Sequence, residues 1–178
     1  MRARVVALLR GVNVGRGNRI AMAELRGLLT DLGYTDVATL LNSGNAVFTV
    51  SQSIETVATD IEEALSRMLS VKSAVVVRTA EELGKTVAQA PLLDIMTDPA
   101  KFLVGFLSGD PKAAGVTAVG ALDVGPDQVR LIGRELYLWC PTGILASPLS
   151  KVPWDKTFGV TVTMRNWNTV TKLLALVG

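Results

Sequence analysis

The 178-residue chain is long enough for one substantial core or for two small subdomains, and its 49% of hydrophobic residues exclude a disordered protein. It has no histidine and one cysteine, so it cannot by itself build a Ser-His-Asp or Cys-His catalytic centre, a common zinc site or an intramolecular disulfide. The net charge of +2 argues against a protein that binds polyanions over its whole surface.

The sequence shows no segment that would place the chain in a membrane. No stretch reaches the roughly 20 apolar residues of a membrane span, and Arg10 interrupts the N-terminal apolar run before it reaches signal-peptide length. We therefore expect a cytoplasmic protein without a membrane partner and, since histidine is absent, without a metal ion or a cofactor. The cysteine, Cys140, follows an aromatic strand and is interpreted as a buried thiol.

The first part of the chain predicts the element order strand, helix, strand, strand, helix, strand. An apolar stripe at helical spacing follows the first strand, and Gly33 stands where a left-handed helix cap is expected. Two short β-prone runs then flank Asn42–Asn45, which has the composition of a hairpin turn. The predicted strands are 3–10, 37–41, 46–50 and 74–77, and the predicted helices are 22–32 and 53–69. This order is typical of the split βαβ of ferredoxin-like domains.

The pattern restarts after a connector that holds a short helix over 79–90. A second hairpin is expected around Gly133-Arg134, with glycine first as a type II′ turn prefers. The remaining predicted strands are 101–107, 129–132 and 135–139, and the remaining helices are 111–119 and 165–177. The sequence thus predicts an α+β fold of two ferredoxin-like halves, packed as one compact unit with antiparallel or mixed sheets. The predicted divisions are an N-terminal subdomain 1–78, a helical connector 79–100 and a C-terminal subdomain 101–178.

The loop after the first strand, LRGVNVGRGNR, is the first candidate site. Its glycines have the spacing GxxxGxG, which fits neither the dinucleotide fingerprint nor the P-loop. Open backbone N–H groups beside Arg16 and Arg19, just before a helix N-terminus, would nevertheless suit an anion. The alternative is a flexible connection between strand and helix.

Two further motifs are polar. Asn42–Asn45 either stabilises its own turn, as asparagines commonly do, or lines a polar site. In TMRNWNTVTKLLAL, residues 163–176, Trp167 belongs to an apolar helical stripe and is expected in the core, with Thr163 as the helix N-cap. Arg165 would then stand in the first helical turn, where the dipole disfavours a cation unless an acidic neighbour or a bound anion offsets it. Plain surface exposure of Arg165 is the alternative.

Three segments together resemble the bacterial DUF1697 family, a domain of unknown function: ALLRGVNVGRGNRIAMAELRGLL, LLNSGNAVF and TMRNWNTVTKLLAL. Their order and intervals carry the resemblance, which runs from Val6 to Leu176. One departure is Arg16, which stands where the family has its second loop glycine. The resemblance implies an α+β fold of two ferredoxin-like halves, and it implies no activity.

The polar residues inside these motifs form a candidate pocket for an anionic small molecule or a nucleotide. The candidate residues are Arg10, Asn13, Arg19, Asn42, Ser43, Asn45, Arg165, Asn166 and Thr169. A nucleic-acid-binding module is one alternative, although aromatic residues are only 5% and the strands lack an RNA-binding motif. A structural protein without a ligand, including a homo-oligomer, is another. No catalytic residue is assigned, and an enzyme would have to work without histidine.

Overall fold

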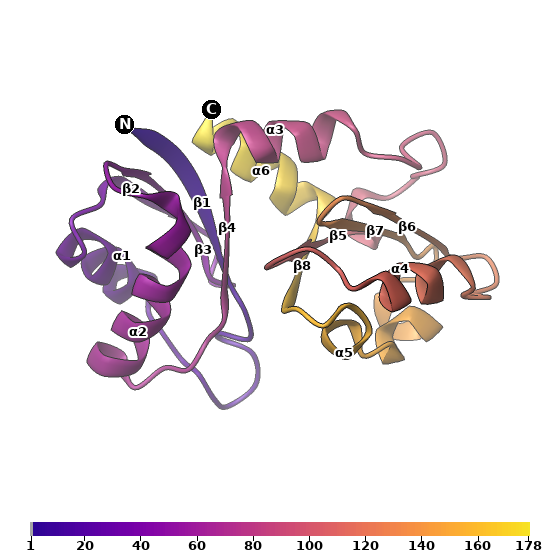
Figure 1. Ribbon diagram of the computed structural model, residues 1–178, viewed down its shortest axis with the longest axis horizontal. Coiled ribbons are helices and arrows are strands. Elements are labelled where there is room, and N and C mark those ends of the chain that lie inside the picture. Colours follow the sequence, from indigo (N-terminus) through magenta and orange to yellow (C-terminus); the bar gives the residue numbers. More distant parts are fainter. Residues whose placement is uncertain (1) are drawn as a thin grey trace. The chain divides into compact units, whose positions relative to one another are not determined.

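The computed structural model describes residues 2–178 and has an α+β fold in two similar halves, each built around a four-stranded antiparallel sheet (Figure 1). Its contacts divide the chain into two compact units. Unit 1 comprises Met1–Gly84 and Leu173–Gly178, and unit 2 comprises Lys85–Lys172. The predicted α+β class with two halves is therefore confirmed.

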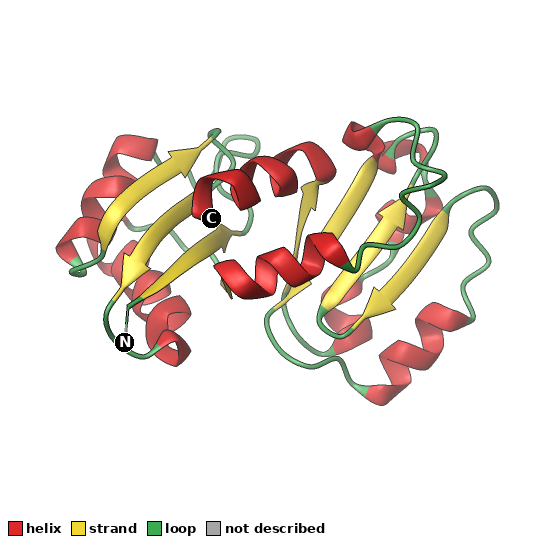
Figure 2. Ribbon diagram, turned by 90° about the horizontal axis from the view of Figure 1, so that it is seen from above, coloured by secondary structure: helices red, strands yellow, loops and turns green. Residues whose placement is uncertain are grey.

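Unit 1 has the predicted order of strands and helices. Its sheet has the strand order β2-β3-β1-β4, and Figure 2 shows neighbouring strands running in opposite directions. Helices α1 Met22–Asp31 and α2 Val57–Leu69 cover one face of this sheet, and a 3-10 turn at Ile54–Thr56 precedes α2 (Figure 1). The strands are β1 Ala3–Leu9, β2 Thr35–Leu40, β3 Asn45–Val50 and β4 Val75–Thr79.

The core of unit 1 lies between the sheet and its two helices. Alternate residues of β1, namely Val5, Ala7 and Leu9, are fully buried in this core, as the period of two along a strand requires. Leu29 of α1 and Ile61 of α2 belong to the same cluster. Each buried leucine, isoleucine or valine contributes roughly 1.5–3 kcal/mol by leaving water. The apolar stripes that predict the helices are therefore the faces that hold them on the sheet.

Two local contacts fix the ends of elements in unit 1. Gly33 follows α1 with φ +86°, the left-handed cap that the sequence predicts, and its N–H donates to Thr30 O at 2.9 Å. Glycine adopts this conformation without the Cβ clash that other residues suffer. Arg4 Nη2 donates to Leu176 O at 3.4 Å, which ties the last residues of the chain to β1.

Unit 2 repeats the sheet of unit 1. Its strand order is β6-β7-β5-β8, again antiparallel, which is the order of unit 1 advanced by four strands. Helices α4 Ala113–Gly120 and α5 Trp154–Phe158 pack on one face, where Val119 and Phe158 join the core. The strands are β5 Phe102–Leu107, β6 Gln128–Ile132, β7 Glu135–Trp139 and β8 Val162–Asn166. Short 3-10 turns occupy Pro99–Lys101, Ile144–Ala146 and Pro148–Lys151.

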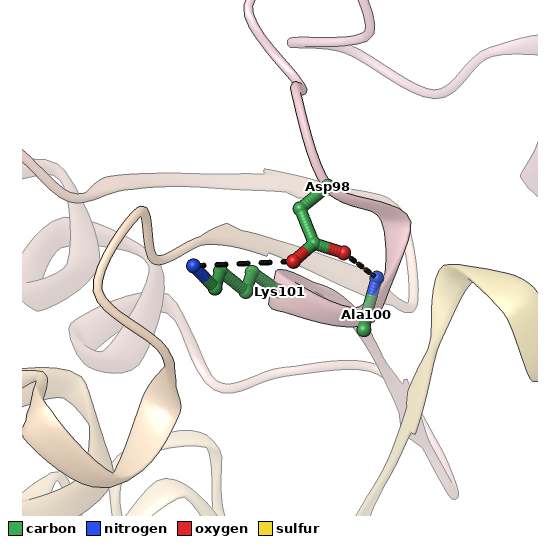
Figure 3. A network of polar contacts seen from close by, with 3 residues as sticks. All are labelled: Asp98, Ala100 and Lys101. Carbon is green, nitrogen blue, oxygen red and sulfur yellow. Dashed lines mark hydrogen bonds and ion pairs between the residues drawn. The ribbon is translucent and has the colours of Figure 1, made fainter.

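A single carboxylate caps the turn that leads into β5 (Figure 3). Asp98 Oδ1 accepts the N–H of Ala100 at 2.9 Å, and Asp98 Oδ2 lies 3.9 Å from Lys101 Nζ. The first contact satisfies an N–H at the start of the 3-10 turn, whereas the second joins two exposed side chains and contributes little to stability. The Asp98-Pro99 turn signal of the sequence thus marks the entry to β5.

The C-terminal motif folds differently from its prediction. The predicted C-terminal helix is present as α6, Trp167–Val177, but it begins two residues later than expected. Val162–Asn166 before it forms β8, so the prediction of Thr163 as the helix N-cap is wrong. β8 pairs with β5 along its whole length, and these backbone hydrogen bonds outweigh the local preference for a helix. Arg165 therefore does not stand in a helical turn, and the dipole argument does not apply to it.

One further helix, α3 Ala80–Ala88, corresponds to the helix predicted over 79–90. Trp167, at the start of α6, is 8% exposed, so its expected place in the core is confirmed. Across residues 2–178, no helix is long and apolar enough to cross a membrane.

Gly115 in α4 tests the close packing of unit 2. A Cβ at this position would overlap Thr157 O and lie 3.1 Å from Phe158 Cδ1. We expect Gly115→Ala to lower the free energy of unfolding by roughly 1–3 kcal/mol, because the new methyl group forces α4 and α5 apart. In the matched control, Gly27→Ala in α1, a Cβ meets no atom of the described residues within 4 Å. This control should stabilise by about 0.5–1 kcal/mol. Urea unfolding measures both variants, and equal effects would contradict the packing argument.

Candidate functional site

Asn13 holds the loop between β1 and α1 in place. Its Nδ2 donates to Ile20 O at 2.9 Å and to Asn42 O at 2.6 Å, and its Oδ1 accepts the N–H of Ile20 at 2.9 Å. Its main-chain N–H donates to Asn18 O at 3.0 Å. The residue adopts φ +56°, a left-handed conformation that asparagine tolerates better than most residues. One side chain therefore closes the loop on itself and ties it to the hairpin.

The β2–β3 hairpin approaches this loop at Gly44. The N–H of Leu9 donates to Gly44 O at 2.8 Å. A Cβ at Gly44 would lie 2.6 Å from Val12 Cγ2 and 2.7 Å from Leu9 Cβ, and the φ of Gly44 is +82°. Glycine meets both the steric and the conformational requirement. The first two motifs of the sequence thus meet in unit 1.

Ser43 and Asn45 serve the hairpin turn itself. The Asn45 side chain is fully buried, and its Nδ2 donates to Leu40 O and to Ser43 Oγ, both at 2.9 Å. These contacts match the turn-stabilising interpretation of Asn42–Asn45. Asn42, by contrast, is exposed.

An open cavity of about 530 Å³ lies where the loop, the hairpin and the start of α1 come together. Arg19 is exposed, and its Nη2 donates to Gly15 O at 3.0 Å, which holds the guanidinium over the loop. Of the predicted site residues, Asn13, Arg19 and Asn42 line this cavity. The full lining is Asn13, Arg19, Ile20, Ala21, Met22, Glu24 and Asn42.

The start of α1 contributes residues that the sequence-based prediction missed, namely Ala21, Met22 and Glu24. Ala21 is the N-cap of α1, and its N–H donates to Glu24 Oε2 at 3.0 Å. Because alanine has no side-chain acceptor, it leaves the N–H groups of the first turn without a cap. The sequence feature that could have located this helix start is Glu24, because a glutamate at the third helical position forms one half of a capping box.

Arg10 is exposed at the end of β1. Its N–H donates to Ala74 O at 2.9 Å and to Ser73 Oγ at 3.0 Å, and Ser73 Oγ in turn donates to Arg10 O at 2.8 Å. These contacts fix the backbone where the chain leaves the sheet. The Arg10 side chain does not line the cavity.

The candidates Arg165, Asn166 and Thr169 lie in unit 2. Burial lowers the pKa of Arg165 to about 10, so the side chain stays charged at neutral pH. Its Nη1 donates to Thr163 Oγ1 at 3.0 Å and to Met164 O at 2.8 Å. Asn166 Oδ1 accepts the N–H of Thr169 at 3.0 Å and caps α6 in place of Thr163. A single pocket built from all three motifs stays a prediction.

Cys140 is fully buried, as expected, and burial raises the pKa of its thiol. A thiol of this kind is a poor nucleophile, because the reactive thiolate is scarce. Within the described residues 2–178, no group of three or more Cys, Asp or Glu side chains could hold a metal ion. The polar side chains that line the cavity of unit 1 are Asn13, Arg19, Glu24 and Asn42.

A family model relates the chain to other proteins. The model described as "Protein of unknown function (DUF1697)" matches residues 2–137. The chain belongs to the DUF1697 family. The matched range includes the loop and the hairpin of the cavity and ends before residues 163–176, which hold the third motif. No curated protein matches the chain.

A solved structure has the same fold as this DUF1697 member. The conserved bacterial protein SP0830 from Streptococcus pneumoniae matches it with a TM-score of 0.80 and 24% sequence identity, and the match covers 100% of both chains. At this identity the likeness shows the fold alone. It supports the architecture of two similar halves and carries no information about a ligand.

Replacing Asn13 tests the contact between the loop and the hairpin in this DUF1697 member. Asn13→Asp keeps the shape of the side chain but turns an oxygen toward the carbonyls of Ile20 and Asn42. We expect the free energy of unfolding to fall by roughly 1–3 kcal/mol. Asn18→Asp is the matched control, since Asn18 also has a positive φ and donates once, to Lys72 O, at an exposed position. Urea unfolding should show a smaller loss for the control, and equal losses would count against the role of Asn13.

A thiol reagent tests the buried state of Cys140. In the native protein the reaction should be far slower than that of free cysteine, because the side chain is buried and burial raises the pKa of the thiol. The same reaction in a denaturing concentration of urea is the control and should reach completion. Fast labelling of the folded protein would show that the thiol is accessible.

Proposed function

We propose that the cavity of unit 1 binds a small anionic molecule that also carries hydroxyl groups, such as a sugar phosphate or a nucleotide. The observation that carries this proposal is that Arg19 and the uncapped start of α1 line the same cavity. A cavity of about 530 Å³ has the size of a small-molecule site.

The start of α1 favours an anion for two reasons. The partial positive charge of a helix N-terminus lies there, and the N–H groups of the first turn receive no side-chain acceptor from Ala21. Arg19 adds a full positive charge and a planar set of donors that fits phosphate or carboxylate. Asn42, at the hairpin side of the cavity, adds an exposed amide.

Glu24 restricts the class of ligand. Its carboxylate also lines the cavity and would repel a second anionic group placed against it. A hydroxyl group of the ligand can instead donate to this carboxylate, as sugar hydroxyls do. The combination of Arg19 and Glu24 therefore favours a ligand with one anionic end and one hydroxyl-bearing end.

The buried state of the aromatic side chains favours this proposal over a nucleic-acid-binding sheet. Recognition of single-stranded RNA by such sheets needs aromatic rings that stack on bases. The strand aromatics are buried, with exposed fractions of 0% for Phe48, Phe102, Phe106 and Tyr137 and 5% for Trp139.

We also propose that the protein is cytoplasmic and that each half is ferredoxin-like. The proposed divisions of the chain are 1–78, 79–100 and 101–178. The strand order that the two sheets share supports the ferredoxin-like description.

Thermal unfolding with added ligands tests the proposed binding. The probes are inorganic phosphate, ribose 5-phosphate and AMP, with sodium chloride at equal ionic strength as the control. A bound probe at 100 times its Kd stabilises the folded state by about 2.7 kcal/mol. We expect ribose 5-phosphate or AMP to raise the Tm of the wild type more than inorganic phosphate does, because Glu24 can accept from their hydroxyl groups.

Two arginine variants locate the binding. Arg19→Ala should abolish the rise in Tm, because Arg19 lines the cavity, whereas Arg16→Ala should keep it, because Arg16 lies in the same loop outside the lining. If no probe raises the Tm above the salt control, or if both variants lose the effect equally, the proposal is wrong.

A further inference from the structure

One edge of the unit 2 sheet is formed by β6, which hydrogen-bonds to β7 on one side (Figure 1). The hairpin between them has a two-residue turn at 133–134, so Ile132 and Glu135 form a hydrogen-bonded pair. The alternation of an antiparallel ladder then directs the N–H and C=O groups of Val129 and Leu131 away from the sheet. These groups match the backbone of another extended strand.

An arginine folds back over this edge. Arg130 Nη1 donates to Val129 O at 2.8 Å, which is one of the outward carbonyls. The edge strands β4 and β8 have the same arrangement, in which Arg78 and Arg165 donate to the carbonyl of the preceding residue at 3.0 and 2.8 Å. The register places these two carbonyls on the outer side of their strands as well. Charged side chains at such positions discourage unwanted strand pairing.

The edges differ in how accessible they are. Arg78 is 2% exposed and Arg165 is half-buried, whereas Arg130 is exposed. The fourth edge strand, β2, has a register shift between Thr35 and Ala38 in its pairing with β3. This irregularity makes β2 a poor partner for a further strand. β6 is therefore the edge that offers a regular and accessible strand.

A groove of about 390 Å³ lies beside β6. Val116 of α4 is 45% exposed and forms part of its apolar wall. The side chains of Val129 and Leu131 pack toward α4 in the core of unit 2, and Arg130 between them points to the opposite face of the sheet. The lining consists of Val116, Val119, Gly120, residues 122–125 and residues 127–131.

We propose that β6 binds an extended segment of a partner protein, which joins the sheet as a further antiparallel strand. The backbone of the segment satisfies the outward groups of Val129 and Leu131, and two apolar side chains opposite these residues lie on the α4 side, along the groove. The residue between them is acidic and lies opposite Arg130, with Cβ atoms about 4.5–5.5 Å apart. The recognised pattern is therefore apolar, acidic, apolar at consecutive positions. Arg130 releases Val129 O and pairs with the acidic side chain.

A second copy of this chain is a poor occupant of the same edge. If two β6 strands pair antiparallel so that the outward backbone groups of both copies are hydrogen-bonded, Val129 of one copy lies opposite Leu131 of the other. This register sets the two Arg130 side chains directly opposite each other. Like charges in this position destabilise a strand pair. The charge at the centre of β6 therefore disfavours self-association and selects a partner of opposite charge.

Two synthetic peptides test this proposal: acetyl-Thr-Thr-Val-Glu-Val-Thr-Thr-amide and the same peptide with lysine in place of glutamate. Amide hydrogen exchange of the full chain, followed by NMR, reports the paired residues. We expect the glutamate peptide to slow exchange at Val129 and Leu131 by about tenfold or more. The amide of Arg130 should change little, because it already donates within the sheet. The lysine peptide should have no such effect.

Two further variants keep the test decisive. Arg130→Glu should exchange the preference, so that the lysine peptide binds and the glutamate peptide does not. Val129→Pro removes an outward N–H without removing a bond to β7, and it should abolish binding that Val129→Ala retains. The proposal is overturned if neither peptide binds the wild type at about 1 mM. It is also overturned if both peptides bind equally, if Arg130→Glu does not exchange the preference, or if β6 pairs with a second copy.

Discussion

The side chain of Asn13 is the contact on which the candidate site depends. It satisfies both the N–H and the C=O of Ile20 and also reaches Asn42 O, so a single amide joins the loop to the hairpin. Gly44 permits this closure, because a side chain there would meet Leu9 and Val12. Asn13, Ile20 and Asn42 all line the cavity, so this contact joins two of its sides.

Much of the fold could be predicted because its signals are local. The apolar stripe of α1, the left-handed glycine after it and the hairpin at Gly133, whose φ is +59°, each follow from a few neighbouring residues. β8 was missed because Thr163 and Arg165 weaken its apolar pattern and a helix follows it directly. Its identity as a strand comes from pairing with β5, which is distant in the sequence.

The sequence identifies the loop and the hairpin that form the candidate site, but it does not identify the role of each residue in them. Sequence position does not reveal which partner an amide takes, so the turn-holding role of Asn45 and the loop-closing role of Asn13 emerge from the fold. Arg16 and Arg19 are equivalent in the sequence, and the geometry places Arg19 at the cavity. The open N-cap at Ala21 becomes visible once α1 is known to begin at Met22.

Unit 1 is assembled from two separate pieces of the chain. Leu173–Gly178 belong to it although the whole of unit 2 intervenes, and Leu176 accepts a hydrogen bond from Arg4 beside the start of β1. During synthesis β1 leaves the ribosome before unit 2, and the segment Leu173–Gly178 follows only after unit 2 has been made. The half of the protein that begins first is therefore the half that finishes last.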